Sequence, residues 1–174
     1  MMGKRVAALL LALLLAAAMI ACSEKESGTP TPDENNNTEQ QNDAFCVKTQ
    51  GVTVELGADA SSVLKKLGEA NSSQEVFDCG AGNSRMYYRY ASFDLYTMKA
   101  DGKETIDQIE LLDDLTQTEK GISIGAAESA VREAYGEPSS ESEGMLTYAK
   151  GDQRIVFEVA DGKVSAIGLL RVTK

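Results

Sequence analysis

The sequence predicts an α+β fold in which two tandem repeats share one continuous antiparallel sheet with helices on one face. Three observations lead to this expectation. Glu55–Ala70 aligns without gaps with Ser123–Pro138, 68 residues later, with six identities in sixteen positions. Each of these segments has apolar residues at helical spacing, and each is followed by apolar runs of strand length. Helices this short are stable only when packed, so a sheet is their expected support.

Glycines bracket both predicted helices at matching places. Gly57 and Gly68 enclose the first helix, and Gly125 and Gly136 enclose the second. A glycine just past a helix favours the left-handed conformation that ends it. Asp59 is a suitable N-cap because its carboxylate accepts from free backbone N–H groups. The apolar stripe of the first helix consists of Ala60, Val63, Leu64 and Leu67.

Each predicted helix belongs to a unit of short strand or turn, helix, and three or four antiparallel strands. Val52–Leu56 and Ile122–Ile124 are the short runs before the helices. Asp101-Gly102 and Asp161-Gly162 indicate hairpin turns at matching places. Repeat one is expected over residues 44–115 and repeat two over residues 116–174. The predicted strands are Met86–Tyr90, Phe93–Met98 and Thr105–Leu112, then Met145–Ala149, Arg154–Val159 and Lys163–Val172.

Residues 1–21 have the pattern of a signal peptide for export. Lys4 and Arg5 form a short positive region, and the apolar stretch Val6–Ile20 follows. This stretch is shorter than the roughly 20 residues that a spanning helix needs. An ordinary cleaved signal peptide and a retained membrane anchor are the alternatives to a lipoprotein signal.

Met19-Ile20-Ala21-Cys22 resembles a lipobox, the motif at which bacterial lipoproteins are lipidated on cysteine and cleaved. The resemblance implies a lipid on Cys22. It also implies localisation on the outer face of the cytoplasmic membrane, or on the outer membrane of a Gram-negative cell. Acyl chains anchor a protein because each buried CH₂ contributes about 0.8 kcal/mol.

The mature chain is expected to have two parts. Residues 22–43 contain no large apolar side chain after Cys22, so they are predicted to be a disordered tether. Residues 44–174 are predicted to form the globular domain, which is long enough for one hydrophobic core.

Charge and composition exclude several classes of function. The chain has 17 basic and 27 acidic side chains, a net charge of −10. Such a surface repels phosphate backbones, so nucleic acid is not an expected partner. The chain has no histidine, which removes the commonest general base and metal ligand. We therefore expect no cofactor, no metal site and no enzymatic activity.

One catalytic pattern can nevertheless be written. Ser62-Val63-Leu64-Lys65 fits the S-x-x-K string of serine enzymes that react with penicillins. The helical pattern places Ser62 and Lys65 off the apolar stripe and in water, where a lysine keeps its charge. Hydrolysis at Ser62 is thus a remote alternative.

Two cysteines remain after lipidation of Cys22. Cys46 and Cys79 in an exported protein predict a disulfide. Two buried free thiols are the alternative.

The repeated frame resembles the β-lactamase inhibitory protein fold. The first copy is Val54-Glu55-Leu56-Gly57 through Val63 and Gly68, followed by Tyr87-Tyr88-Arg89-Tyr90-Ala91-Ser92-Phe93. The second copy is Ile122-Ser123-Ile124-Gly125 through Val131 and Gly136-Glu137-Pro138, as in repeats found in bacterial lipoproteins. The resemblance implies a curved sheet that is presented to protein partners.

Strand alternation indicates which side chains such a sheet would present. Tyr87 and Arg89, then Tyr96 and Met98, are expected to face away from the core. Tyr, Arg and Met are enriched at protein interfaces. The sequence therefore predicts a lipid-anchored module that binds an envelope or extracellular protein through its open sheet face. Inhibition of a β-lactamase or a related cell-wall enzyme is the alternative. Aromatic residues that merely stiffen the sheet would have the same pattern.

Overall fold

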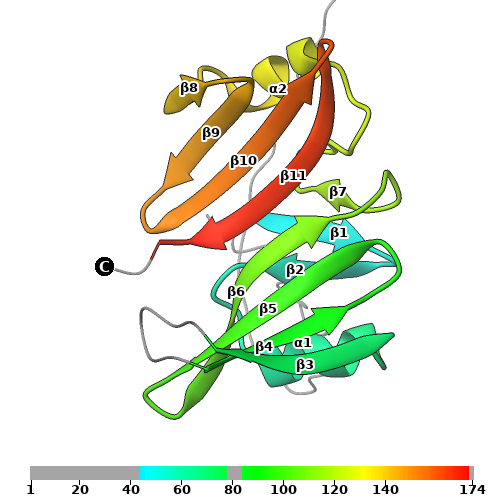
Figure 1. Cartoon of the computed structure of the whole chain (residues 1–174), viewed down its shortest axis with the longest axis vertical. Helices are drawn as coiled ribbons and strands as arrows, with labels where there is room; N and C mark the ends of the chain where they lie inside the picture. Colours follow the sequence, from blue (N-terminus) through cyan, green and yellow to red (C-terminus); the bar gives the residue numbers. More distant parts are fainter. Residues whose placement is uncertain (1–43, 78–83, 173–174) are drawn as a thin grey trace, which may run out of the picture. The chain divides into compact units, whose positions relative to one another are not determined.

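Antiparallel strands dominate the structure, which is a computed structural model that describes residues 44–77 and 84–172. Two sheets and two short helices make up the regular elements of these residues. The fold is therefore β-rich, and the sheet that the sequence predicts is present (Figure 1).

Several sequence predictions concern residues outside those that the structure describes. These are the signal sequence of residues 1–21, the lipidation site Cys22, the tether of residues 22–43, and Cys79. Cys46 is described and is only 8% exposed. Its disulfide with Cys79 therefore stays a prediction. Among the described helices, neither is long and apolar enough to cross a membrane.

The larger sheet has eight strands in the order β3-β4-β5-β6-β11-β10-β9-β8, and neighbouring strands are antiparallel (Figure 1). Tight turns at Asp101 and Asp161, both with positive φ, close the β5–β6 and β10–β11 hairpins. These turns confirm the predicted hairpins. The strands are β3 (Ser72–Phe77), β4 (Ser84–Arg89), β5 (Phe93–Ala100), β6 (Lys103–Leu111), β8 (Ser140–Ser142), β9 (Met145–Lys150), β10 (Gln153–Ala160) and β11 (Lys163–Arg171).

The two four-stranded halves meet at β6 and β11. Ile109 lies opposite Leu169, and Leu111 lies opposite Ile167. All four side chains are at most 5% exposed. Backbone pairing and apolar contact at this seam together make one continuous sheet, as the sequence predicts.

A second, three-stranded sheet has the order β2-β1-β7, formed by Val52–Glu55, Cys46–Thr49 and Gln117–Thr118. Residues 122–124, for which the sequence allowed a short strand or a turn, are not a strand. The Ile122 amide donates to Thr118 Oγ1 at 3.1 Å, and the Ile122 carbonyl accepts from the Thr118 amide at 2.9 Å. A turn therefore uses the backbone groups of Ile122 that a strand would have paired.

Each of the two helices, α1 (Ala60–Leu67) and α2 (Glu128–Tyr135), has eight residues and ends at a glycine with φ of 78°. Asp59 caps α1 as predicted, and its carboxylate accepts from the Ser62 amide at 2.9 Å. Hydrogen bonds from Ser61 and Ser62 lower the pKa of Asp59. The cap of α2 is Ala127, which offers no side-chain acceptor.

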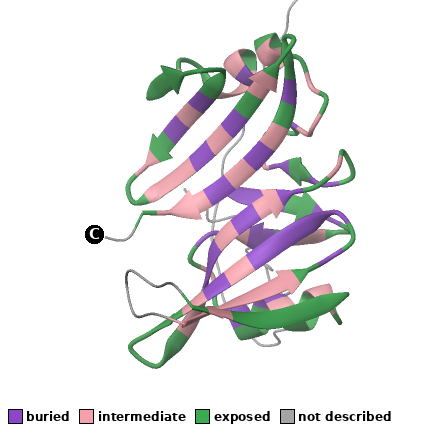
Figure 2. Ribbon diagram, viewed as in Figure 1, coloured by how far each residue is buried: buried purple, intermediate pink, exposed green. Residues whose placement is uncertain are grey.

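The hydrophobic core joins residues of the large sheet, the small sheet and both helices, and Figure 2 shows the buried positions along the strands. Along β10 and β11, buried residues alternate with partly exposed ones, as expected when only one sheet face is covered. The helices contribute Val63 and Val131 to this core. Its largest fully buried side chains include Phe45, Phe157, Leu95, Ile106, Ile109, Leu146, Ile155, Ile167 and Leu169.

Candidate functional site

The four residues predicted for partner binding lie together on the sheet face opposite the core, here called the open face. Tyr87 on β4 lies directly across from Tyr96 on β5. Their neighbours along the strands, Tyr88 and Leu95, are paired on the core side, where Leu95 is fully buried. Side chains alternate between the two faces of a strand, so Tyr87 and Tyr96 point away from the core. The structure thus confirms the predicted orientation, although not its use.

Tyr87, Arg89, Asp94 and Tyr96 form a compact group, here called the tyrosine cluster. The rings of Tyr87 and Tyr96 are 5.1 Å apart between centroids and tilted by 48°. The Arg89 guanidinium carbon lies 6.0 Å from the Tyr87 ring centroid. Arg89 also donates two hydrogen bonds of 2.9 Å to the two carboxylate oxygens of Asp94. This bidentate pair fixes the guanidinium plane beside the aromatic rings.

The cluster combines a buried anion with a partly exposed cation. The side chain of Asp94 is 6% exposed, whereas that of Arg89 is 51% exposed. Hydrogen bonding to Asp94 raises the pKa of Arg89, so its positive charge persists at any physiological pH. Burial, followed by the hydrogen bond and charge of Asp94, raises the pKa of Tyr87. Burial also raises the pKa of Tyr96, so both tyrosines keep their hydroxyl protons.

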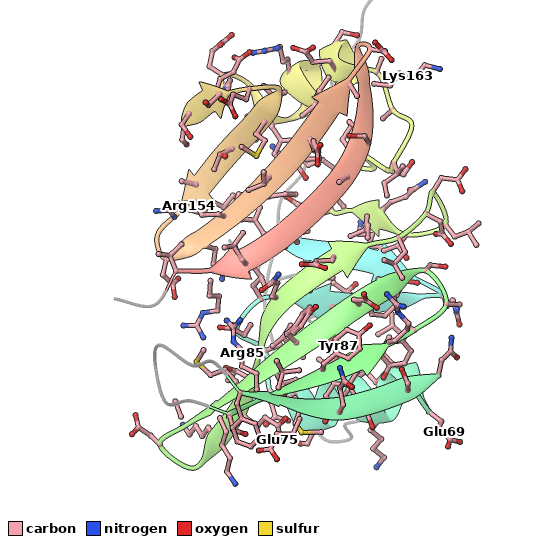
Figure 3. The ribbon with its side chains drawn as sticks, in the orientation of Figure 1. Glu69, Glu75, Arg85, Tyr87, Arg154 and Lys163 are labelled. Carbon is pink, nitrogen blue, oxygen red and sulfur yellow. The ribbon has the colours of Figure 1, made fainter. Side chains whose placement is uncertain are left out.

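Met98 lies on the same face, opposite Arg85 of β4 (Figure 3 labels Arg85 and Tyr87). Arg85 forms an ion pair with Asp107, whose side chain is 1% exposed. Asp107 is the extra residue of a bulge in β6, since Tyr96 pairs with Gln108 but Thr97 pairs with Ile106. Sequence reasoning missed this pair. Asp107 is one of three acidic residues in β6, so the sequence alone does not single it out.

The Arg85–Asp107 pair is buried but incompletely bonded. Asp107 Oδ1 and Arg85 Nε have no hydrogen-bond partner among the described residues. Burial raises the pKa of Asp107, while the positive charge of Arg85 acts in the opposite direction. This ion pair therefore links β4 to β6 at one end of the open face, although burying the Asp107 carboxylate costs free energy of desolvation.

A shallow hollow of about 250 Å³ lies on the other half of the open face. Its central residue is Gly168 of β11, which lies opposite Glu110 of β6 and Val156 of β10. We call it the Gly168 hollow, and sequence reasoning did not identify it. The residues around it are Glu110, Leu111, Leu112, Met145, Val156, Glu158, Ala166, Ile167 and Gly168.

The Ser62-x-x-Lys65 pattern falls on the exposed surface of α1. The Ser62 amide donates to the Asp59 cap, and Ser62 lines a cleft of about 600 Å³ beside the β1–β2 hairpin. Lys65 is exposed and does not line this cleft. The structure therefore does not bring Ser62 and Lys65 together in one cleft.

Cys46, the described member of the predicted disulfide, begins β1. Burial, assisted by the charge of Glu119, raises the pKa of its thiol to about 11. Such a thiol is a poor nucleophile near neutral pH. The position indicates a structural role for this cysteine.

Comparison with known proteins gives no assignment, because no family model, curated protein or solved structure matches this chain significantly.

Proposed function

We propose that this protein is a non-enzymatic module of the cell envelope that binds another protein through the open face of its eight-stranded sheet. The tyrosine cluster carries the proposal. It presents two tyrosines and one arginine side by side, on a face that neither described helix covers. These residue types dominate the binding energy of many protein interfaces.

The internal contacts of the cluster favour binding over a purely stiffening role. Ordering a long arginine side chain at an interface costs about 0.5–1.5 kcal/mol. Asp94 already holds Arg89 with two hydrogen bonds, although the arginine is half exposed. A preordered but accessible guanidinium loses less entropy when a partner binds. Surface complementarity, rather than covalent chemistry, is the proposed mechanism.

A lipid on Cys22 and the tether of residues 22–43 are part of the same proposal. They would hold the domain near the membrane while leaving its open face accessible. The Cys22→Ala variant is expected to appear in the growth medium instead of the membrane fraction. Retention of this variant by membranes would contradict lipid anchoring without affecting the proposed binding face.

We also infer that the domain arose from two repeats, as the resemblance to the β-lactamase inhibitory protein fold implies. In the first half, the Gly57 amide donates to the Ile106 carbonyl at 2.8 Å. In the second half, the Gly125 amide donates to the Val164 carbonyl at the same distance. Each bond ties the turn before a helix to the last strand of its own half. The mirrored strand order on the two sides of the β6–β11 seam supports the same inference.

The experiment compares capture of envelope proteins by the full chain and by variants of its two surfaces. Tyr87→Ala combined with Tyr96→Ala removes both rings from the open face. The matched control, Lys65→Ala with Lys66→Ala, changes two exposed residues of α1. Captured proteins are identified after cross-linking, and the melting temperature of each variant is measured.

The proposal predicts that a partner captured by the wild type and by the α1 control is lost from the tyrosine variant. Tyr87 and Tyr96 are only partly buried, so their removal costs the ring contact, about 0.5–1.5 kcal/mol, and part of their burial, and the domain is expected to stay folded. Undiminished capture by a folded tyrosine variant would overturn the proposal. An assay of β-lactam hydrolysis by purified β-lactamase, with the full chain added, tests the narrower inhibitor hypothesis.

A further inference from the structure

The Gly168 hollow combines an apolar floor with acidic walls. Val156 and Ala166 lie on the strands at its base, and Met145 is 43% exposed at its edge. Glu110 lies directly opposite Gly168 on one side, and Glu158 lies opposite Ala166 on the other strand. Two interstrand spacings, about 10 Å in all, separate β6 from β10. The two carboxylates therefore lie on either side of β11, and apolar side chains and Gly168 form the surface between them.

The glycine itself makes the hollow. Gly168 has no positive φ, and a Cβ atom added there would meet no atom within 4 Å. The backbone therefore does not require glycine at this position. A strand glycine weakens a sheet because it has no side chain to pack. Glycine in the interior of this strand, on a sheet face that neither described helix covers, leaves space for a group from outside the chain.

Neither carboxylate of the hollow has a cationic partner within the described part of the chain. The Glu110 carboxylate accepts a hydrogen bond of 2.6 Å from the side-chain Nε2 of Gln108. No ion pair of Glu158 or Glu110 occurs among residues 44–77 and 84–172. Arg154, the basic residue of β10 on this face, instead donates to the carbonyls of Gly151 and Gln153. The local negative charge is thus unneutralised.

We propose that the Gly168 hollow binds an arginine or lysine side chain of the protein partner. This inference rests on the proposed function and specifies the chemistry of the partner. The aliphatic stem of the basic side chain would pack over Gly168, beside Val156. Its charged end would take hydrogen bonds to Glu110 or Glu158. Long basic side chains combine an apolar stem and a charged head in this way.

Charge complementarity favours this occupant over other side chains. The whole chain has a net charge of −10, which favours encounter with a basic partner. An acidic group would be repelled by both glutamates. A purely apolar side chain would shield two unpaired carboxylates from water without bonding to them, which is unfavourable.

The test uses the full chain in a mild detergent, with ¹³C-labelled methionine methyl groups. Met145 reports on the hollow, and Met98 reports on the distant half of the same face. The probes are the methylamide of N-acetyl-arginine and its uncharged isostere, the methylamide of N-acetyl-citrulline. We expect saturable shifts of the Met145 signal with the arginine probe and at least tenfold weaker binding of the citrulline probe.

Two variants locate the binding. Gly168→Val fills the hollow without backbone strain and is expected to abolish the Met145 shift while the domain stays folded. Glu110→Gln with Glu158→Gln is expected to weaken arginine binding at least tenfold. The matched control, Glu133→Gln with Glu137→Gln, removes the same charge from exposed positions at and just beyond α2 and is expected to bind normally.

Several results would overturn the proposal. These are equal binding of the two probes, no Met145 shift, or a shift of Met98 alone. Dimerisation of the wild type that Gly168→Val abolishes would assign the hollow to a second copy of the chain instead. The proposed function can fail separately, since it is tested by the Tyr87 and Tyr96 variant in the capture experiment. Arginine binding without a captured partner would contradict only the proposed function. Capture through the tyrosine cluster without arginine binding would contradict only the proposed role of the Gly168 hollow.

Discussion

The Tyr148 hydroxyl donates a hydrogen bond of 3.1 Å to the carbonyl oxygen of Gly136, the residue that ends α2. Tyr90 makes the corresponding bond, at 3.3 Å, to Gly68 at the end of α1. Carbonyls at helix C-termini lack partners within the helix. In both halves, a tyrosine in the strand region therefore fixes the end of the helix against the sheet.

Loss of the Tyr148 hydroxyl should destabilise the domain. Tyr148 is 5% exposed, so the Gly136 carbonyl would gain little compensating hydration in Tyr148→Phe. We expect a loss of about 1 kcal/mol in the free energy of unfolding, measured with urea. Tyr88→Phe is the control, because the Tyr88 hydroxyl makes no hydrogen bond within the described residues. Equal effects of the two substitutions would show that the Tyr148 bond contributes nothing.

Removal of Arg85 should destabilise the domain in a pH-dependent way. Arg85→Met leaves the buried carboxylate of Asp107 without its ion-pair partner, although the charge of Arg171 still acts on it, and this loss costs about 3 kcal/mol near pH 7. Burial raises the folded-state pKa of Asp107 above its ordinary value, and removal of Arg85 raises it further. Between the unfolded and folded pKa values the native state binds more protons, so stability increases as the pH falls. The loss in Arg85→Met should therefore shrink towards pH 4.

Asp107→Asn in the Arg85→Met background provides the matched control. It removes the titrating group, so the difference in free energy of unfolding between this double variant and Arg85→Met should depend on pH. Urea denaturation from pH 4 to pH 8 measures both chains. An equal loss in Arg85→Met at pH 4 and pH 7 would show that Asp107 is not the group responsible.

The regular part of the fold was predictable because its signals are local. Alternation correctly placed Tyr87 and Tyr96 on the face away from the core, and glycines correctly marked both helix ends. The eight-stranded sheet followed from the need of short helices for support. For residues 122–124 the sequence left a strand and a turn open, and the hydrogen bond from the Ile122 amide to the Thr118 side chain favours the turn.

Long-range features could not be predicted in the same way. The Arg85–Asp107 pair depends on a bulge that leaves Asp107 without a partner residue on β5. No local sequence pattern predicts that bulge. The Gly168 hollow depends on strand order, because Glu110 is brought opposite Gly168 only by the β6–β11 seam. A glycine in a strand is visible in the sequence, but its neighbours on other strands are not.

The Cys46 thiol should react slowly in the native protein. Burial raises its pKa from 9.0 to about 11, so its thiolate fraction at pH 8 falls about a hundredfold. The full chain with Cys22→Ala and Cys79→Ser isolates this thiol for reaction with a chromogenic disulfide reagent. We expect rapid reaction only after addition of urea. Fast labelling of the native chain would contradict the buried position of Cys46.

The predicted disulfide is tested on the chain that retains both Cys46 and Cys79. Mass spectrometry of the protein purified without reductant should give a mass 2 Da lower than after reduction, as expected for one disulfide. Release of a free thiol by urea alone, without reductant, would contradict the pairing. Mass spectrometry and the urea experiment together distinguish a disulfide-bonded Cys46 from a buried free thiol.

Glycine substitutions should have opposite effects at Gly125 and Gly168. Gly125 has a φ of 88°, and its amide donates to the Val164 carbonyl. An added Cβ atom at Gly125 would meet nothing within 4 Å, so the cost of Gly125→Ala is backbone strain, about 1–2 kcal/mol. Gly168 has no such φ and also has open space, so Gly168→Ala should be neutral or stabilising by up to about 1 kcal/mol. Urea denaturation measures both, and an equal loss at the two positions would mean that Gly168 is retained for folding rather than for a bound side chain.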